Sequence, residues 1–245
     1  MLCVFQDFPT GIHHRPFGAQ TDGTMLQSIC TTIALGITLA ALRIYLILPG
    51  AKPRSRRSSP ASTCSVAVFL GSGGHTSEAL ALLSGLDFDR YTPRTYFISE
   101  GDALSAQKAI DLENAKGPRS AFSLRVLPRA RRVHQPLFTV PLSAMRSFRA
   151  CVYYMTVAPF TLRNPVANVL ILNGPGTCCT LALAAYVNKF FGLRCPRVIY
   201  VESFARVKGL SLTGKILRSF ADRFIVQWPQ VLQDGGRGEC YGCLV

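Results

Sequence analysis

The residues best suited to chemistry form a glycine-rich turn between an apolar run and a helical pattern: Gly71-Ser72-Gly73-Gly74-His75-Thr76. Glycine tolerates positive φ angles and lets backbone N–H groups approach a ligand closely. The helix that we expect from about Thr76 adds its unpaired N–H groups and the positive end of its dipole. The turn lacks the lysine of a Walker loop and the third glycine of a dinucleotide fingerprint. It predicts a cradle for a phosphate-bearing ligand, with a tight connection that holds no ligand as the alternative.

His75 is the first candidate catalytic residue. At a helix N-terminus the imidazole is biased toward its neutral form, which can accept a proton from a hydroxyl or donate a hydrogen bond to phosphate. A capping or packing role is the alternative. We expect Thr76 as the N-cap, and Glu78 as a first-turn acid whose place is explained by the helix dipole.

A second loop of the same kind, Asn173-Gly174-Pro175-Gly176-Thr177, also lies between a strand pattern and a helix pattern. Two such loops at the carboxyl ends of neighbouring parallel strands face each other across the crevice where α/β sheets bind ligands. We therefore expect both loops to bind the phosphate groups. Glu202, at the end of a third strand, is the second catalytic candidate: it orients a sugar hydroxyl or His75, or it pairs with Arg206.

Short apolar runs alternate with helical patterns and position these loops. Strands are expected at Ser65–Leu70, Arg94–Ser99, Phe122–Leu127, Asn168–Leu172, Arg197–Val201 and Arg223–Gln227, and helices at Thr76–Ser84, Ser105–Ala115 and Thr177–Phe191. This alternation predicts an α/β, Rossmann-like domain over residues 65–245, with a mostly parallel sheet and helices on both faces.

An apolar segment precedes this domain. Residues 24–42 carry no charge, and residues 25–48 are long enough to cross a bilayer as one helix. The basic linker 49–64 follows, whereas the tail 1–24, with Met25 as an alternative start, holds Arg15 as its one Lys or Arg. The positive-inside rule then predicts a lumenal N-terminus and a cytosolic domain. A cleaved signal peptide fits less well, because the basic residues follow the apolar segment.

The formal net charge of +14 is unevenly distributed. No acidic residue lies between Glu113 and Glu202, although twelve lysines and arginines do. Such a field attracts phospholipid headgroups, nucleic acid or a phosphorylated substrate. Nucleic acid is disfavoured because the aromatic residues do not alternate with the arginines. The missing acidic cluster also disfavours Mg²⁺-assisted chemistry, and we expect neither a metal site nor a cofactor.

The segment between Pro141 and Pro159 combines aromatic residues and methionines with Arg146 and Arg149 as its only charges. Two interpretations remain open. The segment is either an interfacial helix in the headgroup layer or an ordinary helix that faces the core.

Several longer blocks resemble one family. The blocks are FLGSGGHTSE (69–78), LNGPGT (172–177), YVESFARVKGLSLTGKIL (200–217), ADRFIVQWPQ (221–230) and the terminal YGCLV (241–245). Their order and spacing are similar to those of the membrane-anchor subunit, number fourteen of the asparagine-linked glycosylation proteins, of a UDP-N-acetylglucosamine transferase. The likeness covers nearly the whole chain. Arg132 stands where the family has an acidic residue, and Gln233–Glu239 is rich in glycine where the family has a short helix.

The resemblance implies the acceptor half of a two-chain glycosyltransferase of the GT-B type. A soluble catalytic subunit, its heterodimer partner, holds UDP-N-acetylglucosamine, so this chain alone is expected to be inactive. The complex adds the second N-acetylglucosamine to GlcNAc-diphospho-dolichol at the cytosolic face of the endoplasmic reticulum membrane, in N-glycan precursor synthesis. By resemblance, the Gly71–Thr76 turn lies over the acceptor diphosphate, and Tyr241, Gly242, Leu244 and Val245 dock the partner. The alternative is a self-sufficient membrane enzyme acting on a lipid phosphate.

Overall fold

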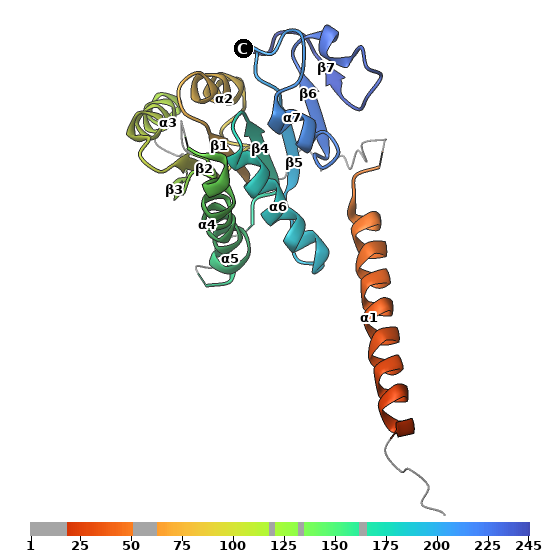
Figure 1. Ribbon diagram of the computed structural model, residues 1–245. Coiled ribbons are helices and arrows are strands. Elements are labelled where there is room, and N and C mark those ends of the chain that lie inside the picture. The colour runs from red at the N-terminus through yellow and green to blue at the C-terminus, as the bar shows by residue number, and fades with distance from the viewer. Residues whose placement is uncertain (1–18, 51–62, 118–120, 132–134, 162–165) are drawn as a thin grey trace, which may run out of the picture. The chain divides into compact units, whose positions relative to one another are not determined.

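The computed structural model describes residues 19–50, 63–117, 121–131, 135–161 and 166–245. It divides into a unit that ends at Leu46 and a unit from Ile47 to Val245 (Figure 1). Most of the predicted tail and of the predicted basic linker, and Arg132, lie outside the described residues.

The first unit holds one long helix, α1 (Ala19–Ile47), which begins ahead of the predicted boundary at residue 25. Its stretch Thr24–Ile47 has 24 residues and a mean hydropathy of 1.8. A helix of this length extends about 36 Å, which exceeds the hydrocarbon thickness of a bilayer. By length and composition, α1 can therefore cross a membrane.

The second unit is built on one parallel sheet of seven strands in the order β3-β2-β1-β4-β5-β6-β7. The strands are β1 (Val66–Leu70), β2 (Arg94–Ser99), β3 (Phe122–Leu127), β4 (Val169–Asn173), β5 (Arg197–Val201), β6 (Arg223–Val226) and β7 (Glu239–Cys240). The predicted parallel α/β sheet is confirmed, and β7 is a strand that the sequence did not predict.

Helices cover both faces of this sheet (Figure 1). They are α2 (Gly74–Ser84), α3 (Ala103–Lys116), α4 (Val140–Val152), α5 (Ala158–Thr161), α6 (Thr177–Phe190) and α7 (Leu212–Leu217), with a 3₁₀ turn, η3, at Pro229–Leu232. Alternate residues of β1 face opposite ways: Val66 and Val68 pack in the cluster of α2 and α3, whereas Ala67 and Phe69 pack in the cluster of α4, α6 and α7. Crossovers between parallel strands are right-handed, so the face on which a helix lies depends on the direction in which the chain adds strands. From β1 the chain adds β2 and β3 in one direction, and from β4 it adds β5 and β6 in the other, so the two groups of helices lie on opposite faces.

The segment with two open interpretations forms a 3₁₀ turn η1 (Leu137–Thr139), α4, a π-helical turn η2 (Tyr153–Val157) and α5. Its inner side belongs to the core. The Ser147 hydroxyl lies 3.1 Å from Oγ1 of Thr180 on α6, and Cys151 and Met155 are buried. The core-facing interpretation therefore holds for the inner side, while the outer side exposes large apolar residues such as Leu142.

Candidate functional site

The first glycine-rich turn connects β1 to α2 and lies at the carboxyl edge of the sheet. Helix α2 begins at Gly74, and its N-cap is Gly73 with a φ of 66°. Thr76 is therefore not the N-cap that we predicted. Ser72, Gly73 and Gly74 are exposed, so the peptide groups of the turn face solvent.

Thr76 stabilises the turn through a side chain that is buried inside the domain. Its buried hydroxyl donates to the carbonyl oxygen of Gly71 and lies 2.6 Å from Oγ of Ser105 on α3. Ser105 in turn bonds Asp102, the N-cap of α3. The side chain of Thr76 is thus used inside the protein, and only the backbone around it is available to a ligand.

The two glycine-rich loops are in direct contact. A Cβ atom on Gly71 would lie 2.8 Å from Cδ of Pro175 in the second loop. Gly174 has a φ of 100°, and a Cβ there would lie 2.5 Å from Cγ of the His75 ring. Both glycines are needed because the loops approach more closely than any side chain allows. The structure thus brings together the two loops that the sequence singled out.

His75 is oriented by the amide of Asn173. Its Nδ1 atom lies 3.0 Å from Oδ1 of Asn173, whose Nδ2 donates to Glu78 Oε2 at 3.0 Å and to the carbonyl oxygen of Val201 at 3.3 Å. Because Nδ2 has two acceptors, the amide oxygen must face His75, so Nδ1 carries the hydrogen. In the neutral ring, Nε2 then keeps its lone pair and can accept a proton from a ligand.

Glu78 is not in the first turn of α2, contrary to our prediction, because the helix begins at Gly74 rather than at Thr76. Its carboxylate accepts hydrogen bonds from Asn173, from the Ser203 hydroxyl at 2.8 Å and from the Phe204 N–H at 3.3 Å. It therefore ties α2 to the ends of β4 and β5. Sequence reasoning missed this role, because the partners of Glu78 are distant in the chain.

Glu202 contacts the N-cap of α7 and is not hydrogen-bonded to His75. Within the described part of the chain its carboxylate is bonded by Ser211, through the N–H and the hydroxyl at 3.1 Å each, and by Ser203 N–H and Tyr200. Arg206 is not among these partners, so the predicted pairing with Arg206 is wrong. Glu202 is buried, and it fixes the loop that leads to α7, where Ser211 is the N-cap.

The helices that start at the two loops lack side-chain caps. The N-caps of α2 and α6 are Gly73 and Gly176, whereas α3 and α7 are capped by Asp102 and Ser211. A glycine cap leaves N–H groups of the first turn available to an anion, which the helix dipole also favours. The two N-termini therefore start at loops that contact each other.

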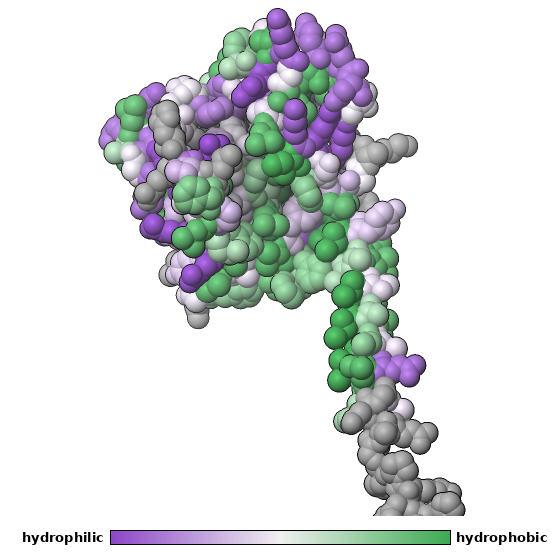
Figure 2. Space-filling model, in the orientation of Figure 1, coloured by the Kyte–Doolittle hydropathy of each residue, from purple (hydrophilic) through white to green (hydrophobic). Residues whose placement is uncertain are grey.

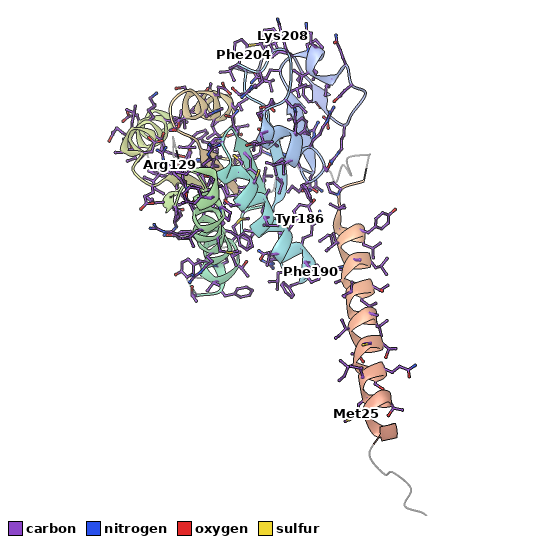
Figure 3. The ribbon with its side chains drawn as sticks, viewed as in Figure 1. Met25, Arg129, Tyr186, Phe190, Phe204 and Lys208 are labelled. Atoms are coloured by element: carbon purple, nitrogen blue, oxygen red, sulfur yellow. The ribbon has the colours of Figure 1, made fainter. Side chains whose placement is uncertain are left out.

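Basic residues lie beside the starts of α2 and α6. The buried hydroxyl of Thr177 accepts a hydrogen bond of 3.2 Å from Ala130 N–H, which holds Arg129 and Arg131 beside the N-terminus of α6. Arg129 is labelled in Figure 3. On the other side, Lys108 reaches Ser77 in the first turn of α2. These cations favour an anionic ligand, and no group of three His, Cys, Asp or Glu side chains in the described ranges is placed to hold a metal.

A cavity of about 270 Å³ lies at the amino-terminal edge of the sheet, away from these loops. Its lining is mainly apolar, with Phe97, Phe122 and Tyr154, but it also includes Arg125 and Arg94, and the Arg94 guanidinium is already bonded to Glu113. Convergent polar groups are what distinguish a ligand site from a packing gap, and they lie at the carboxyl edge. We therefore place the candidate site at the two loops.

The C-terminal segment runs along the carboxyl end of β6. The Leu244 N–H donates to Oε1 of Gln227, and Tyr241, Leu244 and Val245 are exposed, as is Gly242. The glycine-rich stretch before it is held by Arg218, whose guanidinium binds Asp234 at 2.9 Å. The tail thus offers apolar side chains at the surface on an ordered backbone.

Comparison with known proteins points to one family. The model of the family described as oligosaccharide biosynthesis protein Alg14 like matches residues 66–244. A UDP-N-acetylglucosamine transferase subunit ALG14 from Cryptococcus neoformans var. neoformans is 47% identical over 77% of this chain and 84% of its own length. The corresponding subunits are 39% identical in Schizosaccharomyces pombe, over 86% and 98%, and 34% identical in Homo sapiens, over 77% and 84%.

The fold is similar to that of one solved structure in particular. Acinetobacter baumannii MurG matches with a TM-score of 0.50 at 14% sequence identity, over 74% of this chain and 46% of MurG. This chain therefore spans about half the length of that structure. The likeness confirms the predicted GT-B-type, Rossmann-like fold.

Proposed function

The chain belongs to the Alg14 family, and from this premise we propose that it is the membrane-anchored, acceptor-binding subunit of a two-chain UDP-N-acetylglucosamine transferase. The proposed acceptor is GlcNAc-diphospho-dolichol, to which the complex adds a second N-acetylglucosamine. The observation that supports this most strongly is the meeting of two glycine-capped helix N-termini at one oriented histidine.

The acceptor diphosphate is proposed to bind the exposed backbone of the first loop, Ser72–Gly74, and the second loop at Gly174 and Gly176. Each loop supplies N–H groups and the positive end of a helix dipole. The arginines beside α6 add charge at the rim. A diphosphate, with two anionic groups, suits two such N-termini better than a single carboxylate does.

His75 is proposed as the general base. Its Nε2 takes the proton of the acceptor hydroxyl while that oxygen bonds to C1 of N-acetylglucosamine. The bond from C1 to the diphosphate oxygen breaks, and UDP leaves with the electron pair. Asn173 keeps Nδ1 protonated, and thus Nε2 basic, throughout this step. Glu202 is proposed to act as a positioning residue, through the loop that begins at Ser203.

The donor nucleotide sugar is proposed to bind a soluble catalytic subunit that docks on Tyr241, Gly242, Leu244 and Val245. Helix α1 anchors the pair in the endoplasmic reticulum membrane, with the N-terminus lumenal and the sheet unit cytosolic. The basic residues after the apolar segment support that orientation.

Reconstitution tests this proposal. The full chain is purified in lipid nanodiscs, and transfer of labelled N-acetylglucosamine to a GlcNAc-diphospho-isoprenoid is measured with and without the soluble subunit. Transfer is expected only with both chains, and a variant that lacks Leu244 and Val245 should lose both the subunit and the activity. Transfer by the single chain would instead support the self-sufficient enzyme.

A further inference from the structure

The helices on one face of the sheet expose many large apolar side chains. On α4, η2, α6 and α7 these form an outer surface, which we call the α4–α7 face: Leu142, Met145, Tyr153, Leu183, Phe191 at the end of α6, and Ile216. Leu142 is 80% exposed and Phe191 70%. Figure 2 shows the apolar side chains as a green band over α6 and α7, and Figure 3 shows Tyr186 and Phe190 on α6.

The opposite helical layer has no comparable surface. Among the described side chains of α2 and α3, the one large apolar residue that is exposed is Leu104. Isolated apolar residues at a surface are ordinary, whereas a contiguous apolar surface marks an interaction site. This contrast within one domain indicates that the α4–α7 face contacts a specific partner or surface.

The helices of the two layers also differ in their acidic residues. Helices α4, α5, α6 and α7 contain no Asp or Glu and carry Arg146, Arg149, Lys189 and Lys215. Helices α2 and α3 carry two lysines together with the exposed Asp111, the half-buried Glu78 and the buried Glu113. Arg146 and Arg149 lie on the same side of α4 as Leu142 and Met145, because these positions are three or four residues apart. Arg146 contacts Glu100 at 3.6 Å in a solvent-exposed pair of small energy. Lys189 contacts Asp222 at 3.5 Å in a pair that is half-buried.

We propose that the α4–α7 face lies against the headgroup layer of an anionic phospholipid bilayer. Apolar and aromatic side chains interspersed with lysine and arginine are the composition of interfacial surfaces, and the absence of acidic residues on these helices complements anionic headgroups. This rests on the proposed anchoring by α1, because a tether keeps the face at high local concentration near the membrane.

Such an orientation also serves the candidate site. The loop that holds Arg129 and Arg131 is fixed by Ala130, whose N–H binds Thr177 at the start of α6 and whose carbonyl accepts from Ser143 in α4. The N-terminal end of α4 is thus linked, through Ala130, to the start of α6 at the second glycine loop. The diphosphate headgroup of a lipid that stays in the bilayer would then reach the two glycine loops without crossing open solvent.

Quenching by brominated lipid tests the proposal. In the full chain, Trp228, the single tryptophan, is replaced by phenylalanine, and one tryptophan is placed by Leu142→Trp or Leu183→Trp. The matched control is Leu104→Trp on α3, and Leu39→Trp reports the anchor. The chains are reconstituted in vesicles of phosphatidylserine and brominated phosphatidylcholine, after circular dichroism has established native folding.

We expect Leu142→Trp and Leu183→Trp to lose most of their fluorescence and Leu104→Trp to keep it. Adding Arg149→Glu to Leu142→Trp should restore fluorescence, whereas Lys116→Glu on α3 should not. If Leu142→Trp and Leu183→Trp stay as bright as Leu104→Trp while Leu39→Trp is quenched, the inference fails and the anchoring stands. An unquenched Leu39→Trp would overturn the anchoring. A change at 142 and 183 that appears only when the soluble subunit is added would identify a protein as the occupant and overturn the inference.

Discussion

The imidazole of His75 is constrained on two sides. Gly174 leaves no room for the ring to move toward the second loop, and the Asn173 amide fixes the hydrogen on Nδ1. The orientation of this amide is in turn fixed by Glu78 and by the Val201 carbonyl oxygen, which accept hydrogen bonds from its Nδ2. A general base needs one nitrogen with a fixed lone pair, and these contacts provide it at Nε2.

Replacing His75 by alanine should lower kcat of the two-chain complex by about 10²–10⁴-fold, the usual contribution of a general base. The soluble subunit is proposed to dock on the C-terminal segment and not on this ring, so its co-purification should remain unchanged. The measurement is transfer at saturating acceptor and donor. Full activity in this variant would remove His75 from the mechanism.

Gly174→Ala tests the packing of the ring. The added methyl meets His75, and the positive φ of 100° adds backbone strain of about 1–3 kcal/mol. The matched control is Gly117→Ala, which has a φ of 114° but no atom within 4 Å of the new Cβ. Both variants should lower the thermal unfolding midpoint, and only Gly174→Ala should also lower kcat. Equal kcat values would show that the position of His75 does not matter.

At the scale of elements, α3 is joined to β2 by a buried ion pair. Arg94 binds Glu113 through two hydrogen bonds of 2.7 and 2.9 Å, and both side chains are buried. Tyr96 donates a third hydrogen bond to the same carboxylate. Because α3 carries Ser105, which supports Thr76, this contact also maintains the first loop.

Glu113→Gln should destabilise the sheet unit by about 3–5 kcal/mol, because Arg94 would keep an uncompensated buried charge. The control is Asp111→Asn on the exposed side of the same helix, which should change stability by less than about 0.5 kcal/mol. Denaturant unfolding followed by circular dichroism measures both. Similar small effects in the two variants would contradict the assigned role of the pair.

The sequence predicts the elements well and the side-chain contacts less well. The predicted bounds of β2, β3 and β5 are those of the structure. Strands β2 and β5 are largely buried, as apolar runs in a parallel sheet are expected to be, whereas β3 is a half-buried edge strand. The start of α2 was misplaced because a glycine cap leaves no polar side chain to mark it. The partners of Glu202 and Glu78 could not be predicted, since they depend on how strand ends meet in space.

At the scale of the whole molecule, several thiols are kept neutral by the core. Burial raises the pKa of Cys151, Cys179 and Cys195 to about 11 in each case. Thiols in the unfolded chain ionise at about pH 8.5. The folded state therefore binds more protons than the unfolded state between these values, and its stability falls as pH rises through this range.

The unfolding midpoint of the full chain should accordingly fall between about pH 8.5 and 11, where ionisation favours the unfolded state. Cys151→Ala should make this fall shallower, because one buried thiol no longer ionises on unfolding. Cys243→Ala is the control, since that thiol is exposed and should leave the slope unchanged. Differential scanning fluorimetry across this pH range measures all three, and parallel curves would contradict the account.

The central claim is that the two glycine-capped helix N-termini bind the acceptor diphosphate. The most direct test is equilibrium binding of a labelled GlcNAc-diphospho-isoprenoid to the full chain in nanodiscs, without the soluble subunit. Gly74→Asp and Gly176→Asp each place a negative charge at one N-terminus, where no atom within 4 Å opposes a side chain, and Gly209→Asp adds the same charge in equally open space away from the loops. A negative charge at a helix N-terminus stabilises the helix, so a loss of binding in these variants would not be explained by unfolding. We predict that both loop variants lose binding and that Gly209→Asp retains it; unchanged binding in the loop variants would contradict the claim.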